Sequence, residues 1–233
     1  MSDSLFWLKS WFPVSLWFPL SVVSLFLLSI LLLAEGLSRF TSMSGELTRK
    51  VVHIGTGNVI LLAWWLNIPP ILGISAAVIA GCIALISFFL PILPSINSVG
   101  RRSLGTFFYA LSIGILIAWF WPLGQPQYAV IGILVMTWGD GMAAVIGQQF
   151  GKHPYQIWGN NKSWEGSLAM MLMSFLVTSW VLLTTVDNHG LVWLTGLLVA
   201  IMATSLETIS KLGIDNLTVP LASAFLAYLM INF

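Results

Sequence analysis

Long runs of apolar residues, separated by short polar segments, dominate this chain. A helix needs roughly 17–25 apolar residues to cross the hydrocarbon core of a bilayer, and shorter runs suffice where protein surrounds the helix. The pattern predicts an all-α, polytopic membrane bundle of about eight helices. We expect them at Leu16–Ala34, Val51–Leu66, Ile71–Leu90, Leu104–Trp121, Gln127–Gln149, Ser167–Val186, Leu191–Ser205 and Leu217–Ile231.

The start of the chain differs from the rest of this pattern. Residues 1–15 combine tryptophans such as Trp11 with Lys9, which is typical of an anchor at the membrane interface. Pro13 interrupts the segment and no small-residue cleavage site follows it cleanly, so a cleavable signal peptide fits poorly. No soluble domain, low-complexity linker or repeat stands out. We therefore expect one integral membrane domain over residues 1–233.

Composition supports the membrane class. Hydrophobic residues make up 58% of the chain and charged residues only 7%, and the mean hydropathy is +0.95. These values are typical of an integral membrane protein rather than of a soluble core. A formal net charge of +1 gives no basic surface for nucleic acid. The single cysteine, Cys82, excludes an intrachain disulfide and a cysteine-based zinc cluster.

The few charges gather in alternate loops. The loops after the first, third, fifth and seventh predicted spans hold every lysine and arginine except Lys9. The positive-inside rule makes those loops cytoplasmic, with both termini facing away from the cytoplasm. Most acidic residues lie on the same side, although topology requires only the cations. The acids therefore favour a polar active site at the cytoplasmic face.

Asp140 is the most unusual charge, because it lies within an apolar run about three turns before the end of the fifth predicted span. An acid in such a place costs roughly 2.5–3.5 kcal/mol on insertion scales, so its presence indicates a functional site. Small residues share its helix face at intervals of three or four: Ala143 or Ala144, Gly147 and Gly151. A packing stripe between membrane helices is the alternative explanation.

The polar segment that follows supplies a cation, Lys162, and a second carboxylate, Glu165. A site for phosphate and a metal ion needs both kinds of group. Ser163 could instead N-cap the sixth helix, with Glu165 in its favourable first turn. That role leaves Asn160 and Asn161 unexplained, so the segment favours a phosphate site.

A second polar stripe lies where the second predicted span begins. Helical spacing places Glu46, Lys50, His53 and Gly57 on one face, with Arg49 beside them. A Glu46–Lys50 ion pair and a hydrogen-bonded histidine would also explain the stripe. Both interpretations remain open at this stage.

Arg101 and Arg102 stand where the fourth predicted span begins. Cations at a helix N-terminus oppose the helix dipole unless an anion is present, and a bound phosphate would remove the conflict. Positive-inside anchoring explains the pair equally well.

The seventh loop carries a further polar cluster of Glu207, Lys211, Asp215 and Asn216. Glu207 and Lys211 could form an i,i+4 pair, and Asp215 with Asn216 could form a turn or an N-cap. Asp and Asn together also supply the hard oxygen ligands that Mg²⁺ prefers. Asp215 and Asn216 are therefore candidate metal ligands.

These segments contain four ordered motifs: Arg49-Lys50-Val51-Val52-His53; Gly139-Asp140-Gly141 with Ala143, Ala144, Gly147 and Gly151; Lys162-Ser163 with Glu165-Gly166-Ser167; and Glu207 with Gly213, Asp215, Asn216, Thr218 and Pro220. From about Gly36 onward the chain thereby resembles the polyprenol kinase family, most closely its bacterial and plastid phytol kinases and more distantly the dolichol kinases. The resemblance implies a multi-pass enzyme that phosphorylates a long-chain isoprenoid alcohol with CTP. The family often has a lysine where this chain has Asn161.

The resemblance and the chemistry of phosphoryl transfer lead to a hypothesis for the site, because this reaction depends on positioning and on neutralising phosphate charge. Mg²⁺ is expected on Asp140, Glu165, Asp215 and Asn216. The catalytic set is Asp140, His53, Glu165 and Asp215, with His53 or a carboxylate taking the alcohol proton. The nucleotide-binding set is Arg49, Lys50, Arg101, Arg102, Gly147, Gly151, Lys162, Ser163 and Lys211. The apolar tail of the alcohol would enter laterally from the bilayer.

Other protein classes fit the sequence less well. A CDP-alcohol phosphotransferase would have arginine where Val145 follows the Asp140-Gly141 motif, and a cytidylyltransferase would carry a basic, Asp-rich terminal signature. A secondary transporter would place Asp140 and His53 near the middle of the bilayer, whereas the polar groups gather toward one face. A soluble-kinase site is excluded, because the sequence has neither a Walker A motif nor a kinase catalytic loop.

Overall fold

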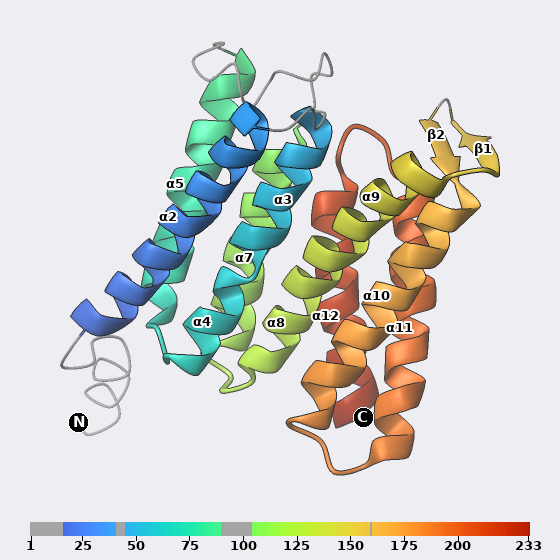
Figure 1. The fold of residues 1–233 in the computed structure, drawn as a ribbon. Helices are drawn as coiled ribbons and strands as arrows, with labels where there is room; N and C mark the ends of the chain where they lie inside the picture. Colours follow the sequence, from blue (N-terminus) through green and yellow to red (C-terminus); the bar gives the residue numbers. More distant parts are fainter. Residues whose placement is uncertain (1–15, 41–44, 90–103, 159) are drawn as a thin grey trace, which may run out of the picture.

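The computed structural model describes residues 16–40, 45–89, 104–158 and 160–233, and these residues are helical apart from one short hairpin and the connecting turns (Figure 1). The helices run roughly side by side as a bundle. Their bounds are α2 (Trp17–Phe40), α3 (Gly45–Gly57), α4 (Val59–Trp65), α5 (Pro70–Phe89), α7 (Gly105–Phe120), α8 (Pro126–Leu134), the π-helix η1 (Val135–Asp140), α9 (Gly141–Phe150), α10 (Trp164–Leu183), α11 (His189–Ile209) and α12 (Asp215–Asn232).

Each predicted span corresponds to helix in the structure, with two subdivisions. The second is divided at Asn58, whose side-chain amide donates to the carbonyl of Ile54 at 2.6 Å and whose Oδ1 accepts from the indole of Trp138 at 3.1 Å. The fifth is one continuous rod of α8, η1 and α9. The predicted interfacial anchor, residues 1–15, lies outside the described residues.

The all-α prediction misses one feature, an antiparallel hairpin between the fifth and sixth predicted spans. Its strands are β1 (Pro154–Ile157) and β2 (Asn160–Ser163), and Tyr155 faces Lys162 across the pair. Burial alternates along β1, so one face of the hairpin points toward the helices. Four residues are too few for such alternation to register in a scan for membrane helices.

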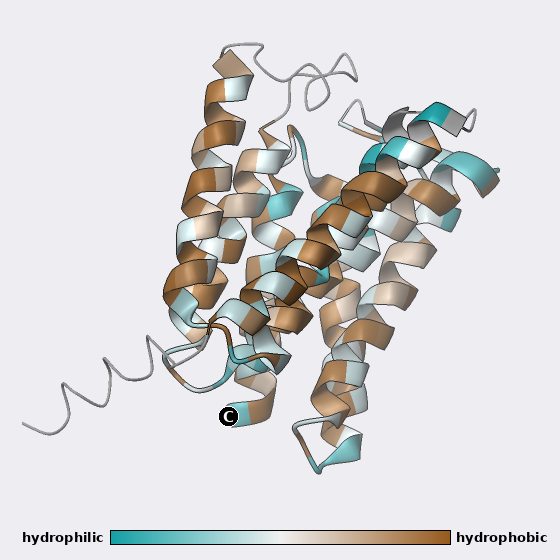
Figure 2. Ribbon diagram, turned by 60° about the vertical axis from the view of Figure 1, so that its left-hand side comes forward, coloured by the Kyte–Doolittle hydropathy of each residue, from teal (hydrophilic) through white to brown (hydrophobic). Residues whose placement is uncertain are grey.

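Five of the described helical segments are long and apolar enough to cross a membrane: Trp17–Leu37, Pro70–Phe89, Pro126–Phe150, Trp164–Leu183 and His189–Ile209. Hydrophobic residues recur along the helices (Figure 2). Many of the large apolar side chains are exposed, for example Leu25 and Leu32 of α2 at 67% and 64%. Water would not favour such a surface, whereas lipid would. The structure therefore fits a polytopic membrane protein.

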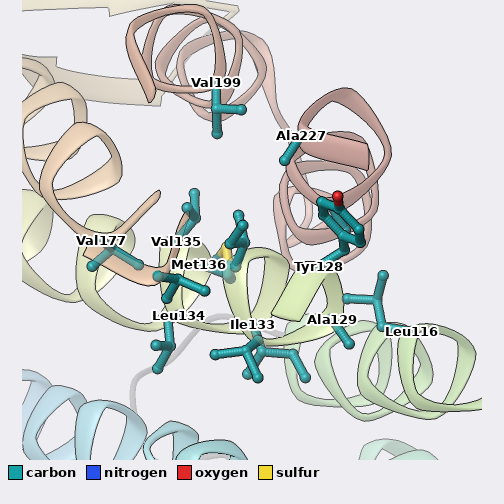
Figure 3. Close-up of a cluster of buried hydrophobic side chains, with 14 of the residues drawn as sticks. Leu116, Tyr128, Ala129, Ile133, Leu134, Val135, Met136, Val177, Val199 and Ala227 are labelled. Carbon is teal, nitrogen blue, oxygen red and sulfur yellow. The ribbon is translucent and has the colours of Figure 1, made fainter. Parts of the chain in front are cut away.

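Helix α8 runs through the centre of the bundle. Every residue from 128 to 134 is buried, and Figure 3 shows their side chains among Leu116 of α7, Val177 of α10 and Ala227 of α12. A helix with apolar residues on all sides is expected to be enclosed by other helices. Its continuation into η1 brings Asp140 to the interior of the bundle near one end.

The π-helical turn allows a close approach between η1 and α3. A Cβ atom on Gly57 would lie 2.1 Å from Thr137 Oγ1, so only glycine permits this packing. Thr137 itself donates to the carbonyl of Ile133 at 2.6 Å and lies 2.7 Å from the hydroxyl of Tyr109. Single π turns within α-helices often mark functional sites.

Candidate active site

Asp140 meets two cationic or ionisable side chains from α3. The Lys50 ammonium donates to Oδ2 of Asp140, and Nε2 of His53 lies 3.8 Å from the same oxygen. The side chains of Lys50 and Asp140 are only 8% and 17% exposed. The His53 ring also packs on Tyr109, with centroids 4.7 Å apart. Two members of the polar stripe predicted on α3, Lys50 and His53, therefore face Asp140, whereas the side chain of Glu46 is not among those described.

A cavity of about 360 Å³ opens on the other side of Asp140. This volume falls within the usual range for small-ligand sites, about 300–1,000 Å³. One wall is the small-residue face of α9, as the spacing predicted, and the other walls come from the hairpin, α10 and α11. The lining residues are Asp140, Ala143, Ala144, Gly147, Gln148, Gly151, Pro154, Asn161, Lys162, Ser163, Gly166, Ser167 and Glu207.

Ser163 begins α10 beside this cavity. Its hydroxyl accepts a hydrogen bond from the Gly166 amide at 3.1 Å, which confirms the predicted N-cap. A Cβ atom on Gly147 would lie 3.1 Å from the Ser163 hydroxyl oxygen, so glycine allows α9 to pack tightly against the start of α10. The amino end of a helix carries partial positive charge, which favours a phosphate there.

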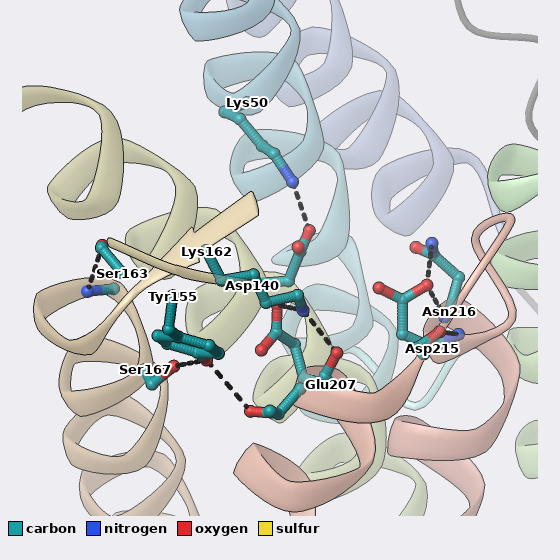
Figure 4. A network of polar contacts seen from close by, with 12 residues as sticks. Lys50, Asp140, Tyr155, Lys162, Ser163, Ser167, Glu207, Asp215 and Asn216 are labelled. Atoms are coloured by element: carbon teal, nitrogen blue, oxygen red, sulfur yellow. Dashed lines mark hydrogen bonds and ion pairs between the residues drawn. The ribbon is translucent and has the colours of Figure 1, made fainter. Parts of the chain in front are cut away.

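Lys162 reaches across the cavity from β2 to α11. Its ammonium donates to both the side-chain carboxylate and the backbone carbonyl of Glu207 (Figure 4). The two side chains are 17% and 11% exposed. A cation and a carboxylate are thus held together on the cavity wall.

Asp215 and Asn216 begin α12 near these groups. Asp215 Oδ1 accepts hydrogen bonds from the Asn216 amide groups, at 3.1 Å from the backbone and 3.3 Å from the side chain. Asp215 lies outside the span predicted for this helix, and partial burial together with the negative charge of Asp140 raises the pKa of its carboxyl. A cation bound between the two carboxylates would offset both effects.

The remaining predicted site residues lie elsewhere. Glu165 bonds with His153 Nδ1 at 2.6 Å, away from the cavity, and the Lys211 ammonium lies 5.3 Å from the centre of the Trp158 ring. Arg49 is on the exposed side of α3. The last two predicted residues, Arg101 and Arg102, are outside the described part of the chain.

Mg²⁺ is bound by hard oxygen ligands such as carboxylates. The described residues contain no group of three or more histidine, cysteine, aspartate or glutamate side chains that could hold a metal ion unaided. In nucleotide sites, however, Mg²⁺ typically uses one or two carboxylates together with phosphate oxygens and water. Asp140 lines the cavity; Asp215, from another helix, does not line it, but the negative charge of Asp140 helps to raise the pKa of its carboxyl. The residues present fit that shared mode of binding.

Glu207 lines the cavity, but the predicted catalytic, nucleotide-binding and metal-binding sets omitted it. The sequence offers it an i,i+4 partner, Lys211, but its actual partner Lys162 is 45 residues away. Tyr155 and Ser167, whose hydroxyl groups lie 2.5 Å apart beside the cavity, were omitted as well. Strand alternation, which places Tyr155 and Lys162 on one hairpin face, is the signal that could have revealed the grouping.

Comparison with known proteins finds relatives of this amino-acid sequence. No family model and no solved structure matches the chain. A phytol kinase from Synechocystis sp. is 52% identical over 213 residues, which cover 91% of each chain. Phytol kinase 1, chloroplastic, from Arabidopsis thaliana is 31% identical over 88% of this chain and 73% of its own.

The chain belongs to the phytol kinase family. A farnesol kinase, chloroplastic, from Arabidopsis thaliana is also similar, with 31% identity over 79% of this chain and 66% of its own. The resemblance inferred from the four sequence motifs is thereby confirmed.

Proposed function

We propose that this membrane enzyme transfers the γ-phosphate of CTP to phytol, giving phytyl phosphate and CDP, in the cavity beside Asp140. The observation that carries the proposal is the composition of that cavity. Two carboxylates, Asp140 and Glu207, one cation, Lys162, and the capped amino end of α10 surround a space of about 360 Å³ at one end of an apolar bundle. The phytol kinase relatives supply the reaction class.

The chemistry follows from these groups. Phosphoryl transfer needs little covalent participation by the protein, and depends on positioning and charge neutralisation. The Lys162 ammonium and the amino end of α10 face the donor phosphates, and Asp140 with Asp215 would hold Mg²⁺, which neutralises charge on the phosphates. The alcohol oxygen forms a bond to the γ-phosphorus while the bond to the β,γ-bridging oxygen breaks. His53, or a neighbouring carboxylate, takes the hydroxyl proton.

Asp140 has the polar cavity on one side and helix α3 on the other. The nucleotide cavity lies on the side of α9 that faces the hairpin, whereas Lys50 and His53 approach Asp140 from α3. The α3 side is where a hydroxyl would meet Asp140 while its chain stays in hydrocarbon. Burial there contributes about 0.8 kcal/mol for each methylene.

A direct assay tests the function. Detergent-solubilised protein is given CTP or ATP labelled on the γ-phosphate, with phytol, geranylgeraniol, farnesol or undecaprenol as acceptor. Labelled phytyl phosphate formed from CTP is the expected product. Transfer from ATP but not from CTP would reassign the donor to ATP. If none of the four alcohols were labelled, the kinase assignment would be refuted.

Selectivity for a single-chain alcohol is the first prediction. Phytol or geranylgeraniol should be phosphorylated at least about tenfold more efficiently than diacylglycerol, because closely packed helices such as α3 and η1 favour a narrow slot over a wide one. Tenfold corresponds to about 1.4 kcal/mol in transition-state binding. Measuring kcat/KM for each acceptor under matched detergent conditions checks it. Equal turnover of diacylglycerol would reassign the protein to head-group metabolism.

The second prediction is the topology of an eight-span protein with a cytoplasmic site. In Figure 1 the hairpin and the connection from α11 to α12 lie at one end, and the turn from α10 to α11 lies at the other. In a Cys82→Ala background, single cysteines near Lys162 and Lys211 should react from the cytoplasmic side, and one within 187–190 only from the opposite side. Labelling of positions 162 and 187 from the same side would contradict the proposal.

A further inference from the structure

The Lys162 side chain is held more tightly than a surface lysine. Its ammonium donates to two acceptors of one residue, the carboxylate and the backbone carbonyl of Glu207. A lysine is a point charge on a flexible stem, and it loses that freedom only when such bonds fix it. Buried ion pairs contribute little net stability, because desolvation of both charges opposes their attraction. Stability alone is therefore a poor reason for this pair.

The rest of the hairpin face is fixed to the same region. Tyr155 is the cross-strand neighbour of Lys162, so both side chains leave the hairpin on one face. The Tyr155 hydroxyl oxygen lies 2.5 Å from Ser167 Oγ in α10 and 3.5 Å from Thr208 Oγ1 in α11. One tyrosine thus joins the hairpin to the start of one helix and the end of another. Lys162, on the neighbouring strand, is anchored at Glu207, the residue that precedes Thr208 in α11.

We propose that Glu207 is a positioning residue for phosphoryl transfer, because it holds the Lys162 ammonium at the cavity wall for the phosphates of the nucleotide donor. Tyr155 supports this by holding the hairpin itself. The inference rests on the proposed function, since it assigns the cavity to a nucleotide. It adds to that function a residue that acts through Lys162 and does not touch the reacting atoms.

Charge and positioning predict opposite results when Glu207 is neutralised. A carboxylate in a cavity for a polyanion repels the ligand, so charge alone predicts that Glu207→Gln strengthens nucleotide binding. Positioning predicts weaker binding, because the amide of glutamine attracts the ammonium less than a carboxylate does and Lys162 becomes mobile. The direction of the change in affinity therefore separates the two roles.

The experiment measures CTP binding and kinetics in solubilised full-length protein. Glu207→Gln should weaken CTP binding, measured without alcohol, by about tenfold, or roughly 1.4 kcal/mol. It should leave the KM for phytol within about twofold of the wild type. In a Lys162→Met background the same substitution should cause no further loss, since contacting residues that act as a unit are not additive. Glu35→Gln, an exposed carboxylate paired with Arg39 in α2, is the matched control.

Several results would overturn the inference. Tighter CTP binding by Glu207→Gln, or an equal loss with and without Lys162, would show that Glu207 does not act through the lysine. If Glu207→Gln fails to fold, Tyr155→Phe replaces it and should weaken CTP binding by about threefold, or about 0.7 kcal/mol; unchanged binding would refute the positioning role. A wild-type protein that binds CTP without phosphorylating phytol would refute the proposed function alone, and the binding series would still decide the role of Glu207.

Discussion

Asp140→Asn is expected to lower phytol phosphorylation by at least about a hundredfold, which makes it the most damaging substitution for activity considered for this site. The replacement keeps the volume of the side chain and removes its charge. It therefore removes a carboxylate that the proposal assigns to Mg²⁺ and to the reacting groups. The measurement is kcat/KM for phytol with saturating CTP, alongside the amount of folded protein in detergent.

The control for this prediction must separate lost chemistry from lost folding. Asp140→Asn leaves the buried Lys50 ammonium without its carboxylate, which is unfavourable in itself. The double variant Asp140→Asn/Lys50→Gln removes both charges and should be stably folded but still inactive. Asp187→Asn, in the turn at the opposite end of the bundle, should retain full activity. Activity of the double variant near the wild-type level would remove Asp140 from the mechanism.

The helices were predictable because their signal is local and long. The apolar run at 71–90 is long enough to cross the hydrocarbon core of a bilayer as a helix. Helix α5 follows it closely, with Pro70 at its first position and Phe89 at its last. The division between α3 and α4 was not predictable in this way. It depends on Asn58, whose side-chain oxygen Oδ1 accepts a hydrogen bond from the indole of Trp138, 80 residues further along the chain. Hydropathy carries no information about such a partner.

The same distinction applies within the site. The wall of α9 follows from the three- and four-residue spacing of Asp140, Ala143, Gly147 and Gly151, which depends only on helix geometry. The pairings of charged residues do not follow from local spacing. Lys50 and Asp140 are 90 residues apart, and each had a plausible alternative explanation nearby. Opposite charges in an apolar bundle must find one another, but the packing of the helices decides which ones meet.

Glu165 shows how a correct local prediction can leave the neighbours of a side chain undetermined. The sequence placed it in the first turn of α10, and the structure confirms this. The first turn has several sides, however, and Glu165 turns toward His153 while Ser163, Gly166 and Ser167 line the cavity. The second carboxylate that lines the cavity beside Asp140 is Glu207 of α11. Direction around the axis of α10, rather than position along it, therefore separates Glu165 from the residues that line the cavity.

Lys50→Met is expected to have the largest effect on stability, a loss of about 3–5 kcal/mol in the free energy of unfolding. The substitution keeps an unbranched side chain in α3 but leaves the Asp140 carboxylate, only 17% exposed, without its principal cation. Unpaired buried charges are costly because neither water nor a counter-ion stabilises them. Chemical unfolding in mixed detergent micelles measures the loss.

The double variant Lys50→Met/Asp140→Asn should recover most of that stability, because it removes the unpaired charge as well as its partner. It should not recover activity, because Asp140 is absent. Lys152→Met, at an exposed position between α9 and β1, provides a matched substitution for which we expect less than about 0.5 kcal/mol. If Lys50→Met were as stable as the wild type, the ion pair would contribute nothing to the fold. In that case Lys50 would serve the site alone, and its loss should appear only as weaker catalysis.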